Sequence, residues 1–382
     1  MSRKKQIVKR PTDWVNLLFF IISPLVAAGG ITWVSLHHGI HWATWILTFV
    51  FLYGTGLGIT AGYHRLLSHR SYDANRFVSW VLLLLGGAAF EASARDWCSD
   101  HRYHHRFVDG ERDPYNITKG FWHAHIGWIV KELEKPRDFE NIKDLDADPM
   151  IRFQHRHYLL LSVAVSFVLP TLIAALWGDA FGGFFLAGVA RVVFNQHATF
   201  CINSVCHKFG RQPYSTRHTG RDSWVTALFT YGEGYHNFHH EFPGDYRNGL
   251  RSYHFDPGKW LIRFCERFGW AYNLHRASPA HIFQAKLQVQ ENWIAKKVEA
   301  EPSATRIHLQ EFLKKSRVRL EEAHSHFLEM KVEYRRLKKE KLDYLHGQRE
   351  KVREEFHKAQ ENFQLALEEW RALMQGPIPN LA

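Results

Sequence analysis

The chain has 382 residues, of which 46% are hydrophobic and 26 are histidine, and a formal net charge of +11. A basic chain can bind nucleic acid, but here the apolar residues gather in long runs. Much of the excess charge is expected beside a membrane, which favours anionic lipid headgroups and an anionic substrate over nucleic acid. The four cysteines form no CxxC pair, which argues against a disulfide and against a thiolate metal site.

Four apolar runs are long enough to cross a membrane, since about 20 helical residues span the hydrocarbon core. With four spans, the N-terminus, the 62–157 loop and everything after residue 201 share one side. The N-terminal segment 1–13 is basic, so the positive-inside rule makes that side the cytoplasm. The four predicted spans are 14–36, 42–61, 158–177 and 180–200.

A fifth apolar stretch, 77–90, has only 14 residues and contains two glycines. It is too short to span comfortably. If it crossed the membrane, His64 and His101 would lie on opposite sides and could not share metal ions. We therefore expect it to form an interfacial or re-entrant helix.

Histidines cluster at the ends of these apolar runs. On a helix, offsets of three and four residues share one face, so each HxxHH triplet can present three imidazoles to a single point. His64 and His69 are five residues apart and would converge only if the helix ended between them. His207, which follows the fourth apolar run, is a weak signal by itself. The two triplets with identical HxxHH spacing are His101, His104, His105 and His236, His239, His240.

Nine clustered imidazoles predict more than one metal ion. Neutral imidazole binds Zn, Cu, Fe and Ni, and nine such ligands exceed the needs of one ion. A structural zinc site needs four ligands and no membrane, whereas ligands at the ends of apolar helices place the metal at the mouth of a lipid-like pocket. That arrangement favours oxygen activation against an alkyl chain by non-haem iron. A ferritin-like centre would need Glu and Glu-x-x-His ligands, which these clusters lack.

The residues around these histidines resemble the membrane-bound fatty acyl desaturases, most closely the delta-9 acyl-CoA desaturases. The resemblance covers residues 14 to about 275. It implies an all-α integral membrane protein with four transmembrane helices, an interfacial helix and a cytoplasmic helical cap that carries a histidine-ligated di-iron site. The similar segments are 58–69, 100–105, 112–115, 148–155, 203–207 and 232–243.

The same resemblance implies the ligands of the metal centre. Asn203 would join the centre through a water molecule. His207, which spacing alone leaves uncertain, becomes a ligand by this comparison. The resemblance implies that two iron ions are held by His64, His69, His101, His104, His105, His207, His236, His239 and His240.

The resemblance also implies a kinked acyl tunnel and a polar site for the substrate head. Trp97, Thr199 and Phe200 match positions that line the kink, while Asp100 and Lys119 would bind the head. Animal acyl-CoA enzymes have an arginine immediately before this aspartate, where this chain has serine. Acyl-CoA and acyl-lipid substrates therefore stay alternatives.

We expect an O2-dependent desaturase that inserts a cis double bond, at the delta-9 position, into a saturated acyl chain. The expected partners are a long-chain fatty acyl thioester, membrane lipids, and a separate electron donor of the cytochrome b5, ferredoxin or rubredoxin type with its reductase, because the chain lacks the haem motif of a fused cytochrome b5 domain. The expected location is the bacterial inner membrane. The alternatives are a di-iron membrane hydroxylase or alkane oxygenase, which shares these histidine boxes, and a histidine-rich metal transporter, which would place ligands along its spans.

The membrane desaturase domain is expected to occupy 14–302, followed by a charged helical extension, 303–375, and a flexible tail, 376–382. The extension favours a helical hairpin or coiled coil broken near Gly347, with an amphipathic helix lying on the cytoplasmic cap as the alternative. A coiled coil could also support self-association. Apolar residues of the segment 303–375 recur seven residues apart at Leu313, Leu320, Phe327 and Tyr334, and again at Phe356, Phe363 and Trp370.

Overall fold

The computed structural model describes residues 11–131, 139–299, 303–339 and 346–375. The expected tail 376–382 and most of the basic segment 1–13 lie outside the described residues. The described chain is mostly helical, and its one sheet pairs β1 (Asp73–Ala74) antiparallel with β2 (Ala271–Tyr272). Two compact units are present, the first formed by 1–212 with 216–277 and the second by 213–215 with 278–382.

Three helices of the first unit are long and apolar enough to cross a membrane: Trp14–His37, Trp42–Ser68 and Tyr158–Ala175. They match the first three predicted spans. The first is α1 (Trp14–His37), which begins where the Asp13 carboxylate accepts the backbone N–H of Asn16. The second extends well past its predicted end at residue 61, because α2 (Trp42–Leu57) continues as η1 (Gly58–Ser68). The third is built from α7 (Tyr158–Val163), η5 (Ala164–Val168) and α8 (Leu169–Ala175).

The fourth predicted span is helical but less apolar. It comprises α9 (Ala180–Gly182), η6 (Gly183–Ala190) and α10 (Arg191–Ser204). Among the described residues, this segment does not reach the apolar character of a membrane span, because α10 carries Arg191, Asn195 and Gln196. The structure therefore gives three candidate spans where the sequence predicted four.

The short apolar stretch forms α3 (Arg76–Gly87), a 12-residue helix capped by Asn75. This helix packs directly on η1 through glycines. A Cβ added to Gly58 would lie 2.3 Å from the backbone nitrogen of Gly86, so the two backbones touch only because neither residue has a side chain. The contact fixes the end of α3 against the helix that carries His64.

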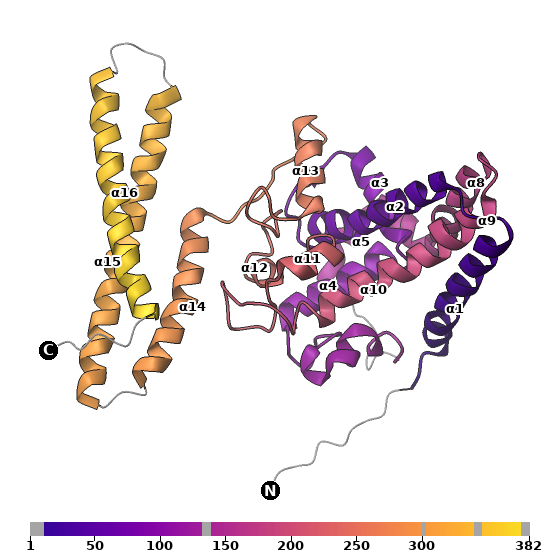
Figure 1. Cartoon of the computed structure of the whole chain (residues 1–382), viewed down its shortest axis with the longest axis horizontal. Helices are drawn as coiled ribbons and strands as arrows, with labels where there is room; N and C mark the ends of the chain where they lie inside the picture. Colours follow the sequence, from indigo (N-terminus) through magenta and orange to yellow (C-terminus); the bar gives the residue numbers. More distant parts are fainter. Residues whose placement is uncertain (1–10, 132–138, 300–302, 340–345, 376–382) are drawn as a thin grey trace, which may run out of the picture. The chain divides into compact units, whose positions relative to one another are not determined.

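The remaining helices of the first unit include those that carry the two HxxHH triplets, whereas His207 lies in the turn after α10. Ile59 and Tyr63 of η1 pack with Cys98, Ile142 and Ile151 in one buried cluster. Figure 1 shows α4, α10, α11 and α12 close together within this unit. The helices are α4 (Ala94–Phe107), η2 (Ile117–Lys119), η3 (His123–Gly127), η4 (Glu140–Ile142), α5 (Lys143–Asp146), α6 (Pro149–Arg156), α11 (Trp224–Phe229), α12 (His236–Glu241) and α13 (Pro257–Arg267).

The second unit contains α14 (Pro279–Glu299), α15 (Ser303–Lys339) and α16 (His346–Gln375). Figure 1 shows α15 and α16 as a long antiparallel pair. The structure divides the chain near residue 278 rather than at 303, because Leu287 and Ile294 of α14 are buried among side chains of α15 and α16.

The seven-residue spacing of apolar residues marks the face along which α15 and α16 pack. Leu320 and Trp370 are buried in the shared core, and Phe327 stacks on both Phe356 and Phe363. Residues 340–345, between the two helices, lie outside the described residues. Gly347, near which the break was expected, lies inside α16.

Candidate metal centre

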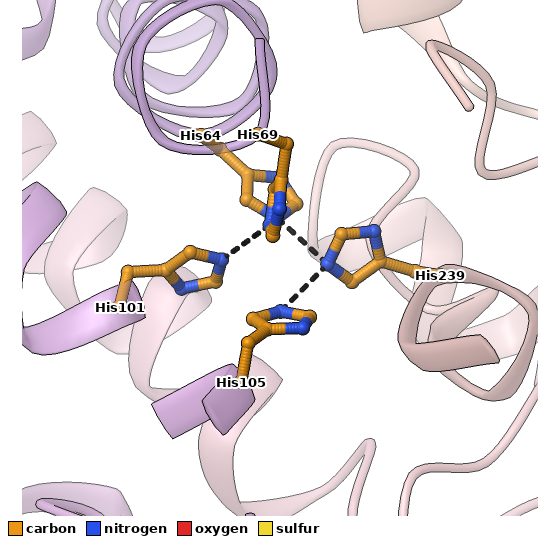
Figure 2. Close-up of side chains that lie close together, drawn as sticks. All are labelled: His64, His69, His101, His105 and His239. Carbon is orange, nitrogen blue, oxygen red and sulfur yellow. Dashed lines mark hydrogen bonds between the residues drawn. The ribbon is translucent and has the colours of Figure 1, made fainter. Parts of the chain in front are cut away.

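The nine histidines singled out from the sequence converge in the first unit as two clusters. Within each cluster, one ligand atom per residue lies within 4.8 Å of all the others. Figure 2 shows the larger cluster, in which two imidazoles from η1 and its C-terminal cap, two from α4 and one from α12 point toward one centre. The larger cluster is His64, His69, His101, His105 and His239, and the smaller one is His104, His207, His236 and His240.

Each HxxHH triplet is divided between the two clusters, so the expectation that each presents three imidazoles to a single point is wrong. His101 and His105 join the larger cluster while His104 joins the smaller one. In the other triplet, His236 and His240 stay together and His239 separates. The reason is helical geometry. At 3.6 residues per turn, residues i and i+4 lie about 40° apart around the axis, whereas i+3 and i+4 lie about 100° apart and diverge.

A π-helical hydrogen bond, in addition to the expected end of the helix, brings His64 and His69 together. The helix ends just before His69, as required, but its last turns are of the π type. The backbone N–H of His69 donates to the carbonyl of His64 at 3.0 Å, an i to i+5 hydrogen bond. This bond returns residue i+5 to the same face as residue i, and the two rings lie 4.8 Å apart between centroids.

Carboxylates behind the rings orient two of the histidines. His64 Nδ1 lies 3.1 Å from Glu233 Oε2, and His104 Nδ1 lies 2.9 Å from Asp113 Oδ1. Glu233 is itself held by the buried guanidinium of Arg65, at 3.0 Å. Such partners fix the tautomer and direct the other ring nitrogen, Nε2, at a metal.

Neutral side chains orient two further rings in the same way. His207 Nδ1 is 2.8 Å from the Thr219 hydroxyl, and His101 Nδ1 is 3.3 Å from the hydroxyl of Tyr115. Thr219 also donates to Asp109 at 2.7 Å. Both clusters therefore have a supporting layer of hydrogen-bonding groups.

The Nε2 atoms inside each cluster face one another at the spacing of metal ligands. The separation is 2.9 Å between His64 and His239, and 3.0 Å between His207 and His236. A neutral imidazole whose Nδ1 proton is engaged presents a lone pair at Nε2. Facing lone pairs repel unless a cation lies between them. Neighbouring ligands held about 2.0–2.1 Å from one ion are themselves about 3 Å apart, so the donor set fits first-row metals.

Burial keeps the cluster imidazoles in the neutral form that metals require. Burial and the neighbouring histidines lower the pKa of His101, His105, His239 and His240 well below the ordinary value. Burial would raise the pKa of Glu233, but the adjacent His64 and Arg65 lower it to about 2, so it stays ionised. The first unit thus supplies neutral ligands with anionic support.

A cavity of about 570 Å³ meets both clusters. His64 and His101 of the larger cluster line it, together with His104 and His236 of the smaller one. Apolar side chains such as Phe20 form other parts of its wall. The volume and the mixed lining suit an elongated apolar ligand that passes the metal ligands.

The structure brings most of the predicted substrate residues to this cavity. Its wall includes the predicted tunnel residues, the predicted head contact at Asp100, and Asn203, which was predicted to join the metal centre through water. Lys119 is exposed on η2 and is not among the described residues that line the cavity. The predicted residues in the wall are Trp97, Asp100, Thr199, Phe200 and Asn203.

Sequence reasoning missed three acidic residues of the site. Asp113 and Glu233 support cluster histidines, and Glu91 lines the cavity. Glu233 lies three residues before His236, so its proximity to the box was a usable signal. Glu91 offered only its position at the end of an apolar stretch.

The sequence matches the family model "Fatty acid desaturase" over residues 40–276. The chain is 44% identical over 294 residues to "Probable acyl-CoA desaturase" of Schizosaccharomyces pombe, covering 75% of this chain and 60% of the relative. It is 44% identical over 292 residues to "Acyl-CoA desaturase 1" of Saccharomyces cerevisiae, covering 75% and 56%. It is 38% identical over 279 residues to "Delta(9)-fatty-acid desaturase fat-6" of Caenorhabditis elegans, covering 71% and 81%.

The matched segment contains all nine cluster histidines and both supporting carboxylates. The chain spans less than two thirds of the length of the two yeast relatives. The family match covers more than half of this chain, from α2 to the end of the first unit. The protein belongs to the fatty acid desaturase family.

Proposed function

We propose that this protein is an O2-dependent acyl-CoA desaturase that inserts a cis double bond at the delta-9 position of a saturated long chain. The observation that carries the proposal is the pair of polyhistidine clusters on the wall of a cavity of about 570 Å³. Relatives at 44% and 38% identity bear acyl-CoA and delta-9 desaturase names. An alkyl chain passing this wall would be held beside both candidate metal positions.

The two clusters would hold two iron ions, one per cluster, with Asn203 close enough to the cavity to assist through water. When bound, the iron supplies the activation of O2 that an unactivated C–H bond requires. The overall reaction removes two hydrogen atoms, one from each of two adjacent carbons, and the donor supplies two electrons together with two protons from solvent. The two electrons of the removed hydrogens and the two from the donor reduce O2 to two waters, and one carbon–carbon double bond is left.

The chain's own residues would position the substrate and exclude water. Phe20 and Phe200 offer apolar surface to the alkyl chain, and Trp97 packs against His101 with ring centroids 4.9 Å apart. Asp100, at the same wall, would contact the polar head. Lys119 would contribute only if the head extends beyond the cavity, because its side chain is exposed.

We further propose the membrane arrangement of the family, with 180–204 as the fourth span. Arg191 would be tolerated there because its guanidinium donates to the carbonyls of Ala88 and Ser166 at 2.7 and 3.1 Å. The clusters would then face the cytoplasm, where a separate electron donor can reach them. The relatives named above are eukaryotic, so they lend no support to a bacterial inner membrane.

Fatty-acid profiling of cells that express the chain with a compatible electron donor tests this proposal. We expect a new cis-monounsaturated acid, and its loss in His239→Ala, which removes one ligand of the larger cluster. His123→Ala, outside both clusters, is the control and should keep the product.

Purified protein should contain about two iron ions per chain. A single ion per chain, or stoichiometric zinc in an active preparation, would overturn the di-iron assignment. A hydroxylated acid as the main product would instead support the hydroxylase alternative.

A further inference from the structure

The first unit has a second cavity, which shares no lining residue with the cavity beside the histidine clusters. Its volume is about 290 Å³, close to the lower end of the volumes of small-ligand pockets. Residues of α2, α3 and α13 form most of its wall. They include Leu57 of α2, Val81 and Leu85 of α3, and Ile262 of α13, and Trp270 follows from the segment after α13.

The wall of this second cavity is apolar. None of the described residues that line it carries a charge. Its one hydroxyl group, that of Tyr72, already donates to the carbonyl of Ala61 at 2.9 Å, which leaves the thiol of Cys265 as the only other polar side-chain group. A buried water molecule needs about two to four polar partners, and this wall does not offer them. The cavity therefore suits an alkyl group.

Exposed aromatic side chains lie around this cavity. Phe77 of α3 is 69% exposed and Phe264 of α13 is 53% exposed, and both line the cavity. Phe264, Phe268 and Trp270 contact one another, with ring centroids 4.9–6.3 Å apart. Large apolar groups that cluster on a surface mark a site of interaction, and tryptophan is enriched where a bilayer meets water.

The exposed side of α13 combines an aromatic stripe with a basic stripe. Trp260 and Phe264 are one helical turn apart, and so are Arg263 and Arg267. The opposite side of α13 is buried, and Ile262 packs there with residues of α3. Figure 1 shows α13 next to α3. Aromatic side chains beside arginines are typical of a helix that lies in the headgroup region of a bilayer.

Two observations favour a bilayer lipid as the occupant of the cavity. Leu57 lies at the end of α2 where the second span continues toward His64, so the proposed membrane arrangement places the cavity at the cytoplasmic end of that span. The exposed charge on α3 and α13 is mainly positive, because Arg76, Arg263 and Arg267 face only Glu266 on these two helices. Arg263 pairs with Glu266 at 3.3 Å in an exposed contact, which is weak in water. The cytoplasmic leaflet supplies anionic headgroups to such a surface.

We propose that α3 and α13 together form a binding site for an anionic phospholipid of the surrounding bilayer. One acyl chain of the lipid fills the second cavity, and its phosphate group lies beside Arg263 and Arg267. The helix α13 is then a second interfacial element of the first unit, next to α3. This inference rests on the membrane arrangement proposed above but not on the reaction, because the second cavity is separate from the histidine clusters.

Photo-crosslinking of lipids tests the site in the whole, iron-loaded protein. The probe is phosphatidylserine that carries a diazirine in the middle of one acyl chain, diluted into phosphatidylcholine nanodiscs. Mass spectrometry then locates the labelled residues. We expect saturable labelling that concentrates on the cavity wall, at Val81, Leu85 and Ile262, and exceeds the labelling of exposed side chains on α1 such as Leu25.

Variants that fill the cavity test the position of the acyl chain. Each CH2 group that a new side chain expels weakens binding about fourfold, so Val81→Trp should lower the labelling of the wall about fifteenfold if it expels two. Gly54→Leu fills the cavity from α2, and a Cβ at this position meets only Leu85, at 3.7 and 3.9 Å. Leu25→Trp, at an exposed position of α1, is the matched control and should label as wild type.

Removal of two arginines tests the position of the headgroup. One basic residue near an anionic surface strengthens lipid binding about fivefold. The double variant Arg263→Gln with Arg267→Gln should therefore lose roughly thirtyfold of the preference for phosphatidylserine over phosphatidylcholine that carries the same diazirine. The control is Arg335→Gln with Lys338→Gln, which removes the same charge from exposed positions of α15 and should leave the preference unchanged.

The outcomes separate this site from its alternatives and from the desaturase proposal. Labelling of the wall that is no stronger than that of α1, or that folded, iron-containing Val81→Trp and Gly54→Leu leave unchanged, overturns the site. Equal labelling by the two lipids in wild type overturns the headgroup assignment, and displacement of the probe by stearoyl-CoA overturns a bilayer lipid as the occupant. A wild type that forms no unsaturated product, yet shows the expected labelling, refutes the desaturase reaction and supports this site.

Discussion

Separate carboxylates support the two histidine clusters, so a substitution of one carboxylate should weaken metal binding at one cluster and leave the other cluster unchanged. Asp113 is 1% exposed and supports His104 of the smaller cluster. Glu233 is 2% exposed and supports His64 of the larger cluster. We predict that Asp113→Asn releases the metal of the smaller cluster first, and that Glu233→Gln releases the metal of the larger cluster first.

The hydrogen bonds of Asp113 set the size of the effect. Its Oδ1 accepts from His104 Nδ1 and from the backbone N–H of Tyr115, and its Oδ2 accepts from the N–H of Asp109. An asparagine amide has one oxygen, so either His104 or Asp109 loses its acceptor. Loss of such support costs metal affinity about tenfold to a hundredfold, or about 1.4–2.7 kcal/mol.

The assay is metal content per chain after equilibration with increasing chelator, with Glu140→Gln as the control. Each carboxylate variant should lose one ion at a chelator concentration about tenfold to a hundredfold lower than wild type. A spectroscopic signal that distinguishes the two metal sites identifies which ion leaves. Simultaneous loss of both ions, or wild-type release curves, would refute the assignment of one carboxylate to each cluster.

Three further predictions concern the fold. Gly58→Ala should destabilise the first unit by about 1–3 kcal/mol, because the added Cβ would lie 2.3 Å from the backbone nitrogen of Gly86. Gly29→Ala is the control, since its Cβ would meet nothing within 4 Å. Thermal unfolding in detergent measures both variants, and equal unfolding midpoints would contradict the close packing of α3 on η1. A chain truncated after Ala277 should keep both metal ions. A chain truncated after residue 302 should aggregate more, because the apolar face of α14 would be exposed. Loss of iron from the folded chain that ends at Ala277 would place the second unit in the metal centre. Cysteine labelling should place residues beside His64 and His101 on the same side of the membrane, and opposite sides would contradict an interfacial α3.

The sequence by itself determined the features that depend on local periodicity and composition. Three apolar runs become helices long enough to span a membrane, and 77–90 becomes a short helix, because run length and cap residues such as Asn75 are local properties. The nine histidines were also recognisable from spacing and resemblance. The fourth predicted span is helical, but Arg191, Asn195 and Gln196 lower its apolar character below that of the other three.

Only the tertiary structure decided which histidines of different elements meet. Helical geometry pairs His101 with His105 and His236 with His240, but only the fold brings His239 to the first pair and His104 to the second. The same holds for Glu91, whose environment comes from α10 and from Tyr231, about 100 and 140 residues away in sequence. It holds for α14 as well, since its buried face is defined by α15 and α16. Contacts between residues far apart in sequence leave no periodic signal, so these features appear only when the chain is folded.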